Sequence, residues 1–318
     1  MKKCIILSAL GEKSFSEEQI KKLKKIKDIT FKKQKNALSE KKFIETVKEY
    51  EVVAVTRRVI KELSAKTLST LVNLKALAIY STGYEWADTD YLKKKGIKTA
   101  YLPGYSTTAV AEHTMAMLLA AFTRLHLSYD YSRNLIDNKK VSLRGYELSG
   151  KNAGIIGYGR IGRKVHSFLR PFGVKVKFYD ADASLQNKFL KDYAGFDDII
   201  SKSDIIILCC SKKRGEKPII GYSKIKKMKN GVVIINPARA DLVNNKGIIK
   251  GLKLKKIFTY AVDEKTGEFN KKNTEPGRVI ETGHTAWYRT EALERGTKEW
   301  VDGIIGLCSG KNVNLIGE

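Results

Sequence analysis

Cysteine, proline and acidic side chains are all scarce in this sequence. Its 318 residues include four cysteines and five prolines, and 34 acidic residues stand against 60 lysines and arginines. Four cysteines, two of them adjacent (Cys209 and Cys210), do not make a disulfide framework, so a reducing cytosol is the expected setting. A hydrophobic fraction of 42% with so little proline excludes a disordered chain, and the length suits two domains.

Long hydrophobic runs are also missing. The first ten residues offer only 4–7 as an apolar core, which is shorter than that of a signal peptide and has no cleavage site after it. The most apolar segment, 109–122, is interrupted by Glu112 and His113 and falls short of the ~20 residues that span a bilayer. We therefore expect a soluble, cytoplasmic protein without a membrane partner.

Positive charge is in excess, with a formal net charge of +26. Nucleic-acid-binding proteins show such an excess, but lysine spread over the surface of an enzyme produces it too. Here lysines recur at helical spacing beside apolar residues, as in 20–27, which is typical of a solvated helix face. No arginine-rich arm, aromatic-interleaved basic stripe or zinc-finger spacing accompanies them. We therefore expect small anions, and not nucleic acid, as the main partners.

Short apolar runs alternate with amphipathic stretches along the whole chain. This alternation is typical of parallel strands joined by crossover helices, so the expected fold class is α/β. The expected strands are 5–10, 52–55, 77–79, 153–157, 174–180, 205–208, 232–236, 258–262 and 279–281. A break at 102–104 precedes a long apolar stretch, 107–127, which as a helix must be covered on several sides and indicates a domain or subunit interface.

The most specific local motif is a glycine-rich turn between an apolar strand and an amphipathic helix. It contains Gly157, Gly159, Arg160, Ile161 and Gly162, which we expect to bind a dinucleotide. The first glycine allows the tight turn, the second lets the backbone approach the pyrophosphate, and the third permits close packing of helix on strand. The pyrophosphate then meets free amides at the positive end of the helix.

Asp180 ends the next strand and completes the strand–helix–strand unit that a dinucleotide needs. A carboxylate at this place accepts hydrogen bonds from the ribose hydroxyls and repels a 2′-phosphate, and no arginine follows in 181–184. NAD is therefore the expected cofactor, in preference to NADP. The other interpretation is a structural glycine turn followed by a solvated aspartate.

Three further polar residues follow strand-like segments in the second half of the chain. They are Arg239, Glu268 and His284. Ligands of parallel α/β sheets gather beyond the carboxyl ends of the strands, so all three side chains could face one cleft. No HExxH or CxxC motif occurs, and we expect no catalytic metal.

The sequence resembles the D-isomer-specific 2-hydroxyacid dehydrogenase family over nearly its whole length. The segments that carry this resemblance, in chain order, are 81–88, 103–113, the glycine turn, 236–239, Asp263 with Glu268, and His284. The resemblance implies two doubly wound parallel-sheet domains. A Rossmann NAD-binding domain, 103–288, would be inserted in a flavodoxin-like substrate domain formed by 1–102 and 289–318. It also implies hydride transfer between NADH and a small 2-oxo acid, and we expect a homodimer.

The same resemblance implies a role for each site residue. His284 would give a proton to the substrate carbonyl oxygen, and Glu268 would hold the imidazole and favour its charged form. Arg239 would bind the substrate carboxylate with its planar guanidinium, a geometry that lysine cannot reproduce. Backbone amides around Thr82 and Gly83 would complete the carboxylate site.

The remaining implications concern the cofactor and the substrate. Asp263 would contact the nicotinamide carboxamide, whereas Cys209 and Cys210 replace the His-x-Pro that the family commonly shows near the cofactor. Trp287 and Tyr288 would add bulk beside the histidine, which suits small acids such as glyoxylate or hydroxypyruvate. The segment 284–288 is also similar to the C-terminal-binding-protein corepressors, so an NAD-bound regulatory or binding protein on the same fold is the alternative.

Overall fold

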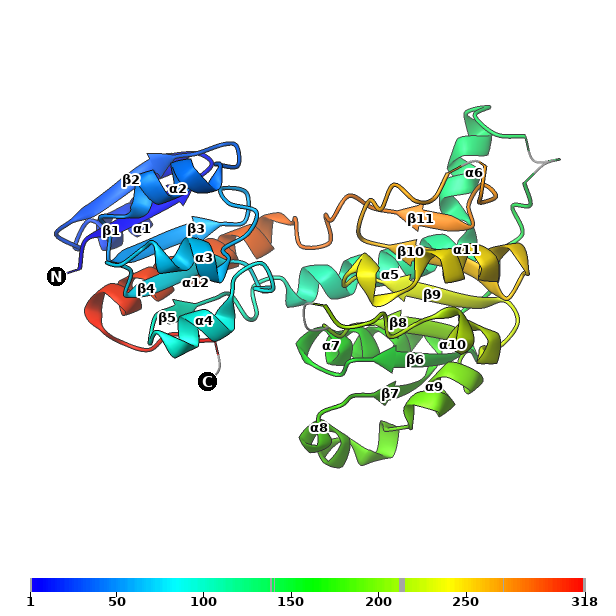
Figure 1. Ribbon diagram of the computed structural model, residues 1–318. Coiled ribbons are helices and arrows are strands. Elements are labelled where there is room, and N and C mark those ends of the chain that lie inside the picture. The colour runs from blue at the N-terminus through cyan, green and yellow to red at the C-terminus, as the bar shows by residue number, and fades with distance from the viewer. Residues whose placement is uncertain (1, 138, 140, 212–214, 271, 317–318) are drawn as a thin grey trace. The chain divides into compact units, whose positions relative to one another are not determined.

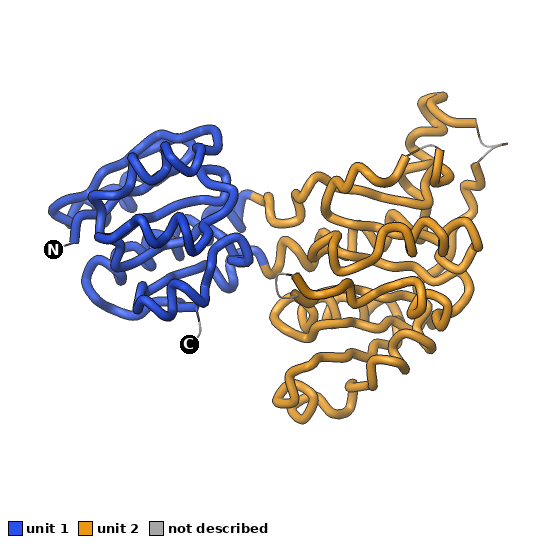
Figure 2. The backbone as a smooth tube through the Cα atoms, in the orientation of Figure 1, with its two compact units in different colours: residues 1–106, 290–318 blue, residues 107–289 orange. Residues whose placement is uncertain are grey.

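A computed structural model describes residues 2–137, 139, 141–211, 215–270 and 272–316. The chain forms two compact units, one made of Met1–Ser106 with Thr290–Glu318 and the other of Thr107–Arg289 (Figure 2). We call them unit 1 and unit 2. The first crossing between them lies four residues beyond the expected boundary at Leu102, because the turn 103–106 precedes the first helix of unit 2 and stays with unit 1.

Unit 1 contains, within the described residues, a five-stranded parallel sheet in the order β2-β1-β3-β4-β5, which is the flavodoxin-like order. Its strands are β1 (Cys4–Ser8), β2 (Ile29–Lys33), β3 (Val52–Thr56), β4 (Ala76–Tyr80) and β5 (Lys98–Ala100). Its helices are α1 (Glu17–Leu23), α2 (Glu40–Val47), α3 (Ala65–Ser69), α4 (Thr89–Lys94) and α12 (Thr290–Ser309), with the 3-10 turn η1 (Gly11–Ser14).

The carboxyl-terminal helix α12 belongs to the core of unit 1. Trp300 is buried on this helix and donates its indole N–H to the carbonyl of Ala78 on β4 over 3.1 Å. Its ring stacks on Phe15 and meets the edge of Tyr80. Segments from both ends of the sequence are thus joined in one hydrophobic core.

Unit 2 contains a second parallel sheet, six-stranded in the described part of the chain and ordered β11-β10-β9-β8-β6-β7 (Figure 1). Its strands are β6 (Asn152–Ile156), β7 (Lys175–Tyr179), β8 (Ile205–Leu208), β9 (Val232–Asn236), β10 (Ile257–Val262) and β11 (Val279–Glu281). Its helices are α5 (Thr107–Thr123), α6 (Leu125–Ser132), α7 (Arg160–Leu169), α8 (Ala183–Lys188), α9 (Phe196–Lys202), α10 (Tyr222–Lys227) and α11 (Asn245–Lys253), with the 3-10 turns η2 (Arg170–Phe172), η3 (Leu190–Asp192) and η4 (Ala240–Leu242).

Alternating side chains of this sheet enter two separate cores. Ile155, Ile207 and Val233 pack with α5 and α7 on one face, whereas Ile206 and Ile234 pack with α9, α10 and α11 on the other. Both faces are covered, which is why the strands read as continuous apolar runs. The chain leaves β6 for β7 on one side and returns to β8 on the other, so a switch point opens beyond the carboxyl end of β6.

The expected fold class is confirmed, and each strand expected from the sequence is present within one or two residues at most boundaries. The edge strands β2 and β5 were not expected. β2 is partly exposed and ends in lysines, and β5 has three residues, so neither shows the buried apolar run that marks the central strands.

The long apolar helix expected at 107–127 is divided in two. Arg124 adopts a left-handed conformation, with φ of 58°, and separates the buried helix α5 from α6. Such a residue ends a helix because it breaks the repeating i to i−4 hydrogen bonds. In the part of the chain that the structure describes, no helix is both long enough and apolar enough for a bilayer crossing.

Candidate active site

The residues singled out in the second half of the sequence gather at one edge of the unit 2 sheet. Each follows the carboxyl end of a strand, and the parallel strands all end at this edge. In strand order along the chain they are Gly157 after β6, Asp180 after β7, Cys209 after β8, Arg239 after β9, Asp263 after β10 and His284 after β11.

The glycine turn is fixed by close backbone packing. Gly157 has a φ of +94°, and a Cβ added there would lie 2.6 Å from the backbone of Cys209 and Cys210. A Cβ on Gly162 would lie 2.2 Å from the carbonyl oxygen of Gly157. These two positions therefore require glycine for the fold itself.

Gly159 differs from its two neighbours in the motif. It precedes α7 in an extended conformation, and a Cβ added there would meet nothing within 4 Å. Among the described residues no side-chain cap hydrogen bond is found at this helix start, so its first amides are available to a ligand. That open, positive helix end fits the pyrophosphate of a dinucleotide. Arg160 is exposed at the start of α7, and Ile161 packs against the core below.

Asp180 is held against the glycine turn by backbone amides. Its Oδ2 accepts a hydrogen bond from the Tyr158 amide at 2.6 Å, and its Oδ1 accepts one from Asp182 at 2.9 Å. The carboxylate is therefore oriented before any ligand binds, as a site for ribose hydroxyls requires.

The two adjacent cysteines form an uncharged wall next to this turn. Burial raises the pKa of Cys209, and burial also raises the pKa of Cys210 to about 11. Both thiols are therefore protonated near neutral pH. The wall can contribute van der Waals contact to a cofactor but no charge.

Asn236 shapes the turn that carries Arg239. It is fully buried at the end of β9, where its Nδ2 donates to the carbonyl of Arg239 at 2.7 Å and its Oδ1 accepts from the amide of Ala238 at 3.1 Å. The Arg239 guanidinium donates to the carbonyl of Ala238 at 3.0 Å. The segment 236–239 was expected to matter for Arg239, and the structure adds that the buried Asn236 controls the local backbone.

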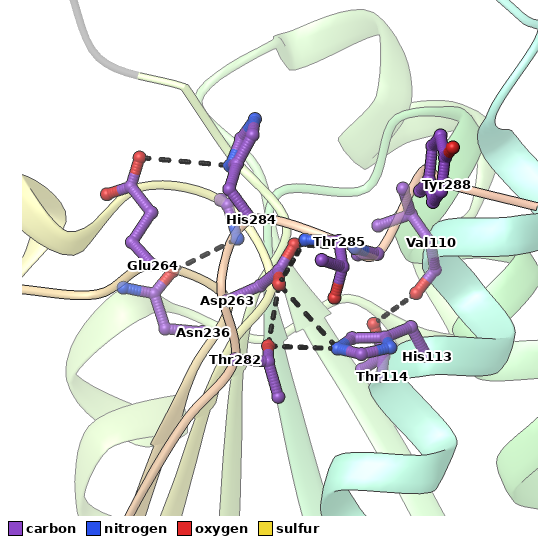
Figure 3. Close-up of polar contacts among 12 residues, drawn as sticks. Val110, His113, Thr114, Asn236, Asp263, Glu264, Thr282, His284, Thr285 and Tyr288 are labelled. Carbon is purple, nitrogen blue, oxygen red and sulfur yellow. Dashed lines mark hydrogen bonds and ion pairs between the residues drawn. The ribbon is translucent and has the colours of Figure 1, made fainter.

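Asp263 fastens the loop that bears His284 (Figure 3). Its Oδ1 accepts hydrogen bonds from the Thr282 hydroxyl at 2.6 Å and the Thr285 amide at 2.9 Å, and its Oδ2 accepts from the Ala286 amide at 2.9 Å. The residue is only 2% exposed. It therefore acts within the protein as a clamp on the segment 282–286.

His113 on α5 extends this network. Its Nε2 lies 3.0 Å from the Thr282 hydroxyl oxygen, and Arg289 approaches its Nδ1 at 3.1 Å. Because Arg289 can only donate, Nδ1 accepts and Nε2 carries the proton. Burial, aided by the charge of Arg289 and opposed by that of Asp263, lowers the pKa of His113, which agrees with a neutral ring.

His284 belongs to the same loop as Thr282, and its side chain lies toward Glu264 and away from His113 (Figure 3). It has a left-handed φ of 58°. Its Nδ1 is 3.9 Å from Oε1 of Glu264. The other oxygen of Glu264 accepts a hydrogen bond from the Ala240 amide at 2.6 Å. The structure therefore brings His284, the carboxylate of Glu264 and the backbone next to Arg239 together.

Glu268, expected beside the imidazole, has a different contact. Its Oε1 accepts a hydrogen bond from Nδ2 of Asn245 at 3.0 Å. Glu268 and His284 nevertheless line one open cavity of about 1020 Å³. Further polar groups on its walls are Asp241, Asn244, Asn245, Lys246, Glu264, Lys265 and Thr266.

Thr82 and Gly83 belong to unit 1, beyond the end of β4. The Thr82 hydroxyl donates to the carbonyl of Leu102 at 2.8 Å, and the Gly83 carbonyl accepts from the Ser81 hydroxyl and the Trp86 indole. These bonds give the loop a defined shape.

Among the described residues, no group of three or more histidine, cysteine or acidic side chains is arranged to hold a metal ion.

Together, the glycine turn, the fixed carboxylate and the polar strand ends define a dinucleotide-binding α/β protein. Comparisons with known proteins agree. Residues 115–286 match the family described as D-isomer specific 2-hydroxyacid dehydrogenase, NAD binding domain. The chain belongs to this family, and it is an NAD-dependent oxidoreductase.

Individual relatives show the extent of the similarity. Hydroxypyruvate reductase of Blautia hydrogenotrophica is 30% identical over 256 residues, which cover 77% of this chain and 79% of the relative. Glyoxylate reductase of Thermococcus litoralis is 30% identical over 247 residues, which cover 74% of this chain and 73% of the relative. The apo-structure of D-lactate dehydrogenase from Escherichia coli superposes with a TM-score of 0.75 at 26% identity, covering 99% of each chain. These matches give no support to the corepressor-like alternative.

Glu264 and Thr282 were not singled out in the sequence, and Asn236 was named only as part of the segment 236–239. Each lies within three residues of a strand end, which is the signal that could have found them. What they contact depends on neighbouring strands and loops, and a single sequence does not contain that information.

Proposed function

We propose that the protein reduces a small 2-oxo acid, such as glyoxylate or hydroxypyruvate, to the D-2-hydroxy acid with NADH. One observation carries this proposal: Arg239 and His284 follow β9 and β11, which flank β10 in the NAD-binding sheet. A guanidinium for a carboxylate and an imidazole for a carbonyl oxygen are the groups that such a substrate needs. The names of the reductases described above support the same substrate class.

Each step of this reaction uses a residue described above. NADH, when bound, supplies the hydride. Arg239 binds the substrate carboxylate, and the contact from the backbone amides around Thr82 and Gly83 that the family resemblance implies stays a prediction. His284 donates a proton to the carbonyl oxygen during reduction and accepts it back during oxidation. Glu268, on the wall of the same cavity, is the acidic partner that the family resemblance implies.

The cofactor contacts are assigned in the same way. Gly157, Gly159, Arg160, Ile161 and Gly162 form the pyrophosphate turn, and Asp180 binds the ribose hydroxyls. The contact between Asp263 and the nicotinamide carboxamide remains a prediction, because both oxygens of this carboxylate already accept hydrogen bonds from the loop.

The oxidation of NADH with a panel of 2-oxo acids tests the reaction. We expect turnover by the wild-type protein and a product of D configuration. In His284→Ala kcat falls about 100-fold or more, and in Arg239→Ala KM rises and kcat falls. Arg144→Ala, at an exposed position of unit 2, is the matched control and retains activity. Undiminished turnover by His284→Ala would remove the proposed proton donor.

We also propose a homodimer, formed through the α6 region, in the reducing cytosol. Leu125, Tyr129 and Leu135 are large apolar side chains that are more than half exposed there. Beside them, the buried guanidinium of Arg124 has Nε and Nη1 atoms without a hydrogen-bond partner among the described residues. A second copy of the chain would cover this apolar surface.

The cysteines, free in the described structure, suit a reducing compartment.

Light scattering with size-exclusion chromatography tests the oligomer. The wild type should have twice the monomer mass. Leu125→Glu with Leu135→Glu should give a folded monomer, whereas Leu254→Glu, another exposed leucine of unit 2, should leave the dimer intact.

A further inference from the structure

Arg289 stands at the point where unit 2 ends. It is the last residue of this unit, and the chain passes to unit 1 directly after it. Its Nη1 donates to the carbonyls of Thr285 at 3.2 Å and of Tyr288 at 2.9 Å. Its Nη2 lies 3.1 Å from Nδ1 of His113 on α5, the helix with which unit 2 begins. One guanidinium therefore joins the first helix of unit 2 to its last loop.

This contact is the first of a chain of hydrogen bonds that runs in one direction. A guanidinium only donates, so His113 accepts at Nδ1 and carries its proton on Nε2. Nε2 lies 3.0 Å from the hydroxyl oxygen of Thr282, and that hydroxyl donates to Oδ1 of Asp263 at 2.6 Å (Figure 3). Each group thus donates to the next, from Arg289 to the buried carboxylate of Asp263.

The chain of hydrogen bonds ends on the loop that carries His284. Asp263 accepts the amides of Thr285 and Ala286, the two residues after this histidine, at 2.9 Å each. His284 has a left-handed φ of 58°, a conformation that persists only where surrounding contacts hold it. The position of the proposed proton donor therefore depends on Arg289 through the groups between them.

The chain of hydrogen bonds requires a neutral His113. A protonated ring would carry a hydrogen on Nδ1 and would no longer accept from Arg289. Burial lowers the pKa of His113, the charge of Asp263 after β10 raises it, and the charge of Arg289 after β11 lowers it further. Glu112, its neighbour on α5, is exposed. Arg289 therefore favours the same neutral ring from which it requires an acceptor.

From this geometry we propose that Arg289 and His113 are positioning residues for the reaction. Arg289 holds the neutral imidazole of His113, and His113 holds the loop 282–286 in the conformation that presents His284 to the substrate. The inference rests on the proposed function and deepens it. Neither residue is assigned a contact with the reacting atoms, so both act through the loop, and Arg289 acts through His113.

Titration of the imidazoles by NMR tests the first link, between Arg289 and His113. The chain has four histidines, so single substitutions assign every signal. In wild type the nitrogen chemical shifts of His113 should place its proton on Nε2. In Arg289→Ala the pKa of His113 should rise, because a positive charge at 3.1 Å is lost while Asp263 remains. This titration reports the contact independently of the stability of the protein.

Arg170→Ala is the matched control for the titration. Burial and the charge of Arg170 lower the pKa of His166, another buried histidine of unit 2, and the charge of Asp192 opposes them. The control should therefore raise the pKa of His166 and leave that of His113 unchanged. It should also retain wild-type kcat, because Arg170 lies at an exposed position outside the site.

A double-mutant cycle on kcat tests the second link, between His113 and the reaction. Arg289→Ala and His113→Phe, which keeps a ring but neither nitrogen, should each lower kcat about tenfold. The double variant should also lose about tenfold, well short of the hundredfold that independent residues would give. The dissociation constant for NADH should stay within about twofold, because the glycine turn is unchanged. Arg289→Lys still donates to Nδ1 and should restore part of kcat.

Three results would overturn the inference. An unchanged titration of His113 in Arg289→Ala removes the first link. Unchanged kcat in Arg289→Ala, or independent losses that multiply in the double variant, remove the second. All three leave the proposed function in place when the wild type turns over. Absence of turnover by wild type with every 2-oxo acid would instead overturn the proposed function and the positioning role with it.

Discussion

Thr282 donates its hydroxyl hydrogen to Oδ1 of Asp263 over 2.6 Å, and this bond joins the end of β10 to the loop that follows β11. The loop carries His284 in a left-handed conformation that a non-glycine residue seldom adopts. Such a conformation persists only where surrounding contacts hold it. The buried aspartate provides those contacts, so the position of the histidine depends on it.

Replacement of Asp263 by asparagine should therefore loosen the loop. Asparagine offers one acceptor oxygen, so the Ala286 amide or its neighbours would lose a buried partner, at a cost of about 1–3 kcal/mol in the free energy of unfolding. Urea unfolding measures the free energy of unfolding, and steady-state kinetics measure kcat. Both quantities should decrease in Asp263→Asn. Asp302→Asn, at an exposed position of α12, should change neither.

The first two glycines of the turn, Gly157 and Gly159, should respond differently to alanine. Gly157→Ala should lower stability by at least about 1–2 kcal/mol, because φ is +94° and the new Cβ would meet the backbone of Cys209 and Cys210. Gly159→Ala should leave stability unchanged, because its Cβ meets nothing, but should weaken NADH binding if the pyrophosphate approaches there. Thermal melting with and without NADH separates these effects. Equal stability of the two variants would contradict the packing argument.

Asp180 should determine the choice between NADH and NADPH. Its carboxylate is oriented by the amides of Tyr158 and Asp182, so its negative charge has a fixed position. Asp180→Ala should raise KM for NADH about tenfold, which is equivalent to ~1.4 kcal/mol. The difference between the KM values for NADH and NADPH should become smaller. Kinetics with both cofactors measure this change. The neighbouring Asp182→Ala provides the control, because its side chain caps α8 instead.

The cysteines should react with iodoacetamide in an order set by their pKa values. A hydrogen bond from Cys4, together with the charge of Lys2, lowers the pKa of Cys308, whereas burial raises that of Cys210 to about 11. Since the thiolate is the reactive form, Cys308 should be labelled first near neutral pH and Cys210 only under alkaline conditions. Mass spectrometry of the labelled peptides gives the order. NADH should protect Cys210 and leave Cys308 unaffected.

The sequence by itself determined the fold class and the phosphate-binding turn. Central strands such as β8 and β9 are buried on both faces and therefore appear as uninterrupted apolar runs. The glycine turn is equally local, because the conformation of Gly157 and the close approach at Gly162 exclude a side chain. Edge strands escaped prediction because half-exposed residues carry no such pattern.

Only the tertiary structure decided which carboxylate meets His284. Glu264 and Glu268 are close in the sequence and chemically identical, and either could reach an imidazole from the end of β10. The choice depends on the Ala240 amide, on Asn245 and on the anchor at Glu281, which come from three other segments of the chain. Contacts of this kind form only when strands distant in sequence are paired, so no local pattern encodes them.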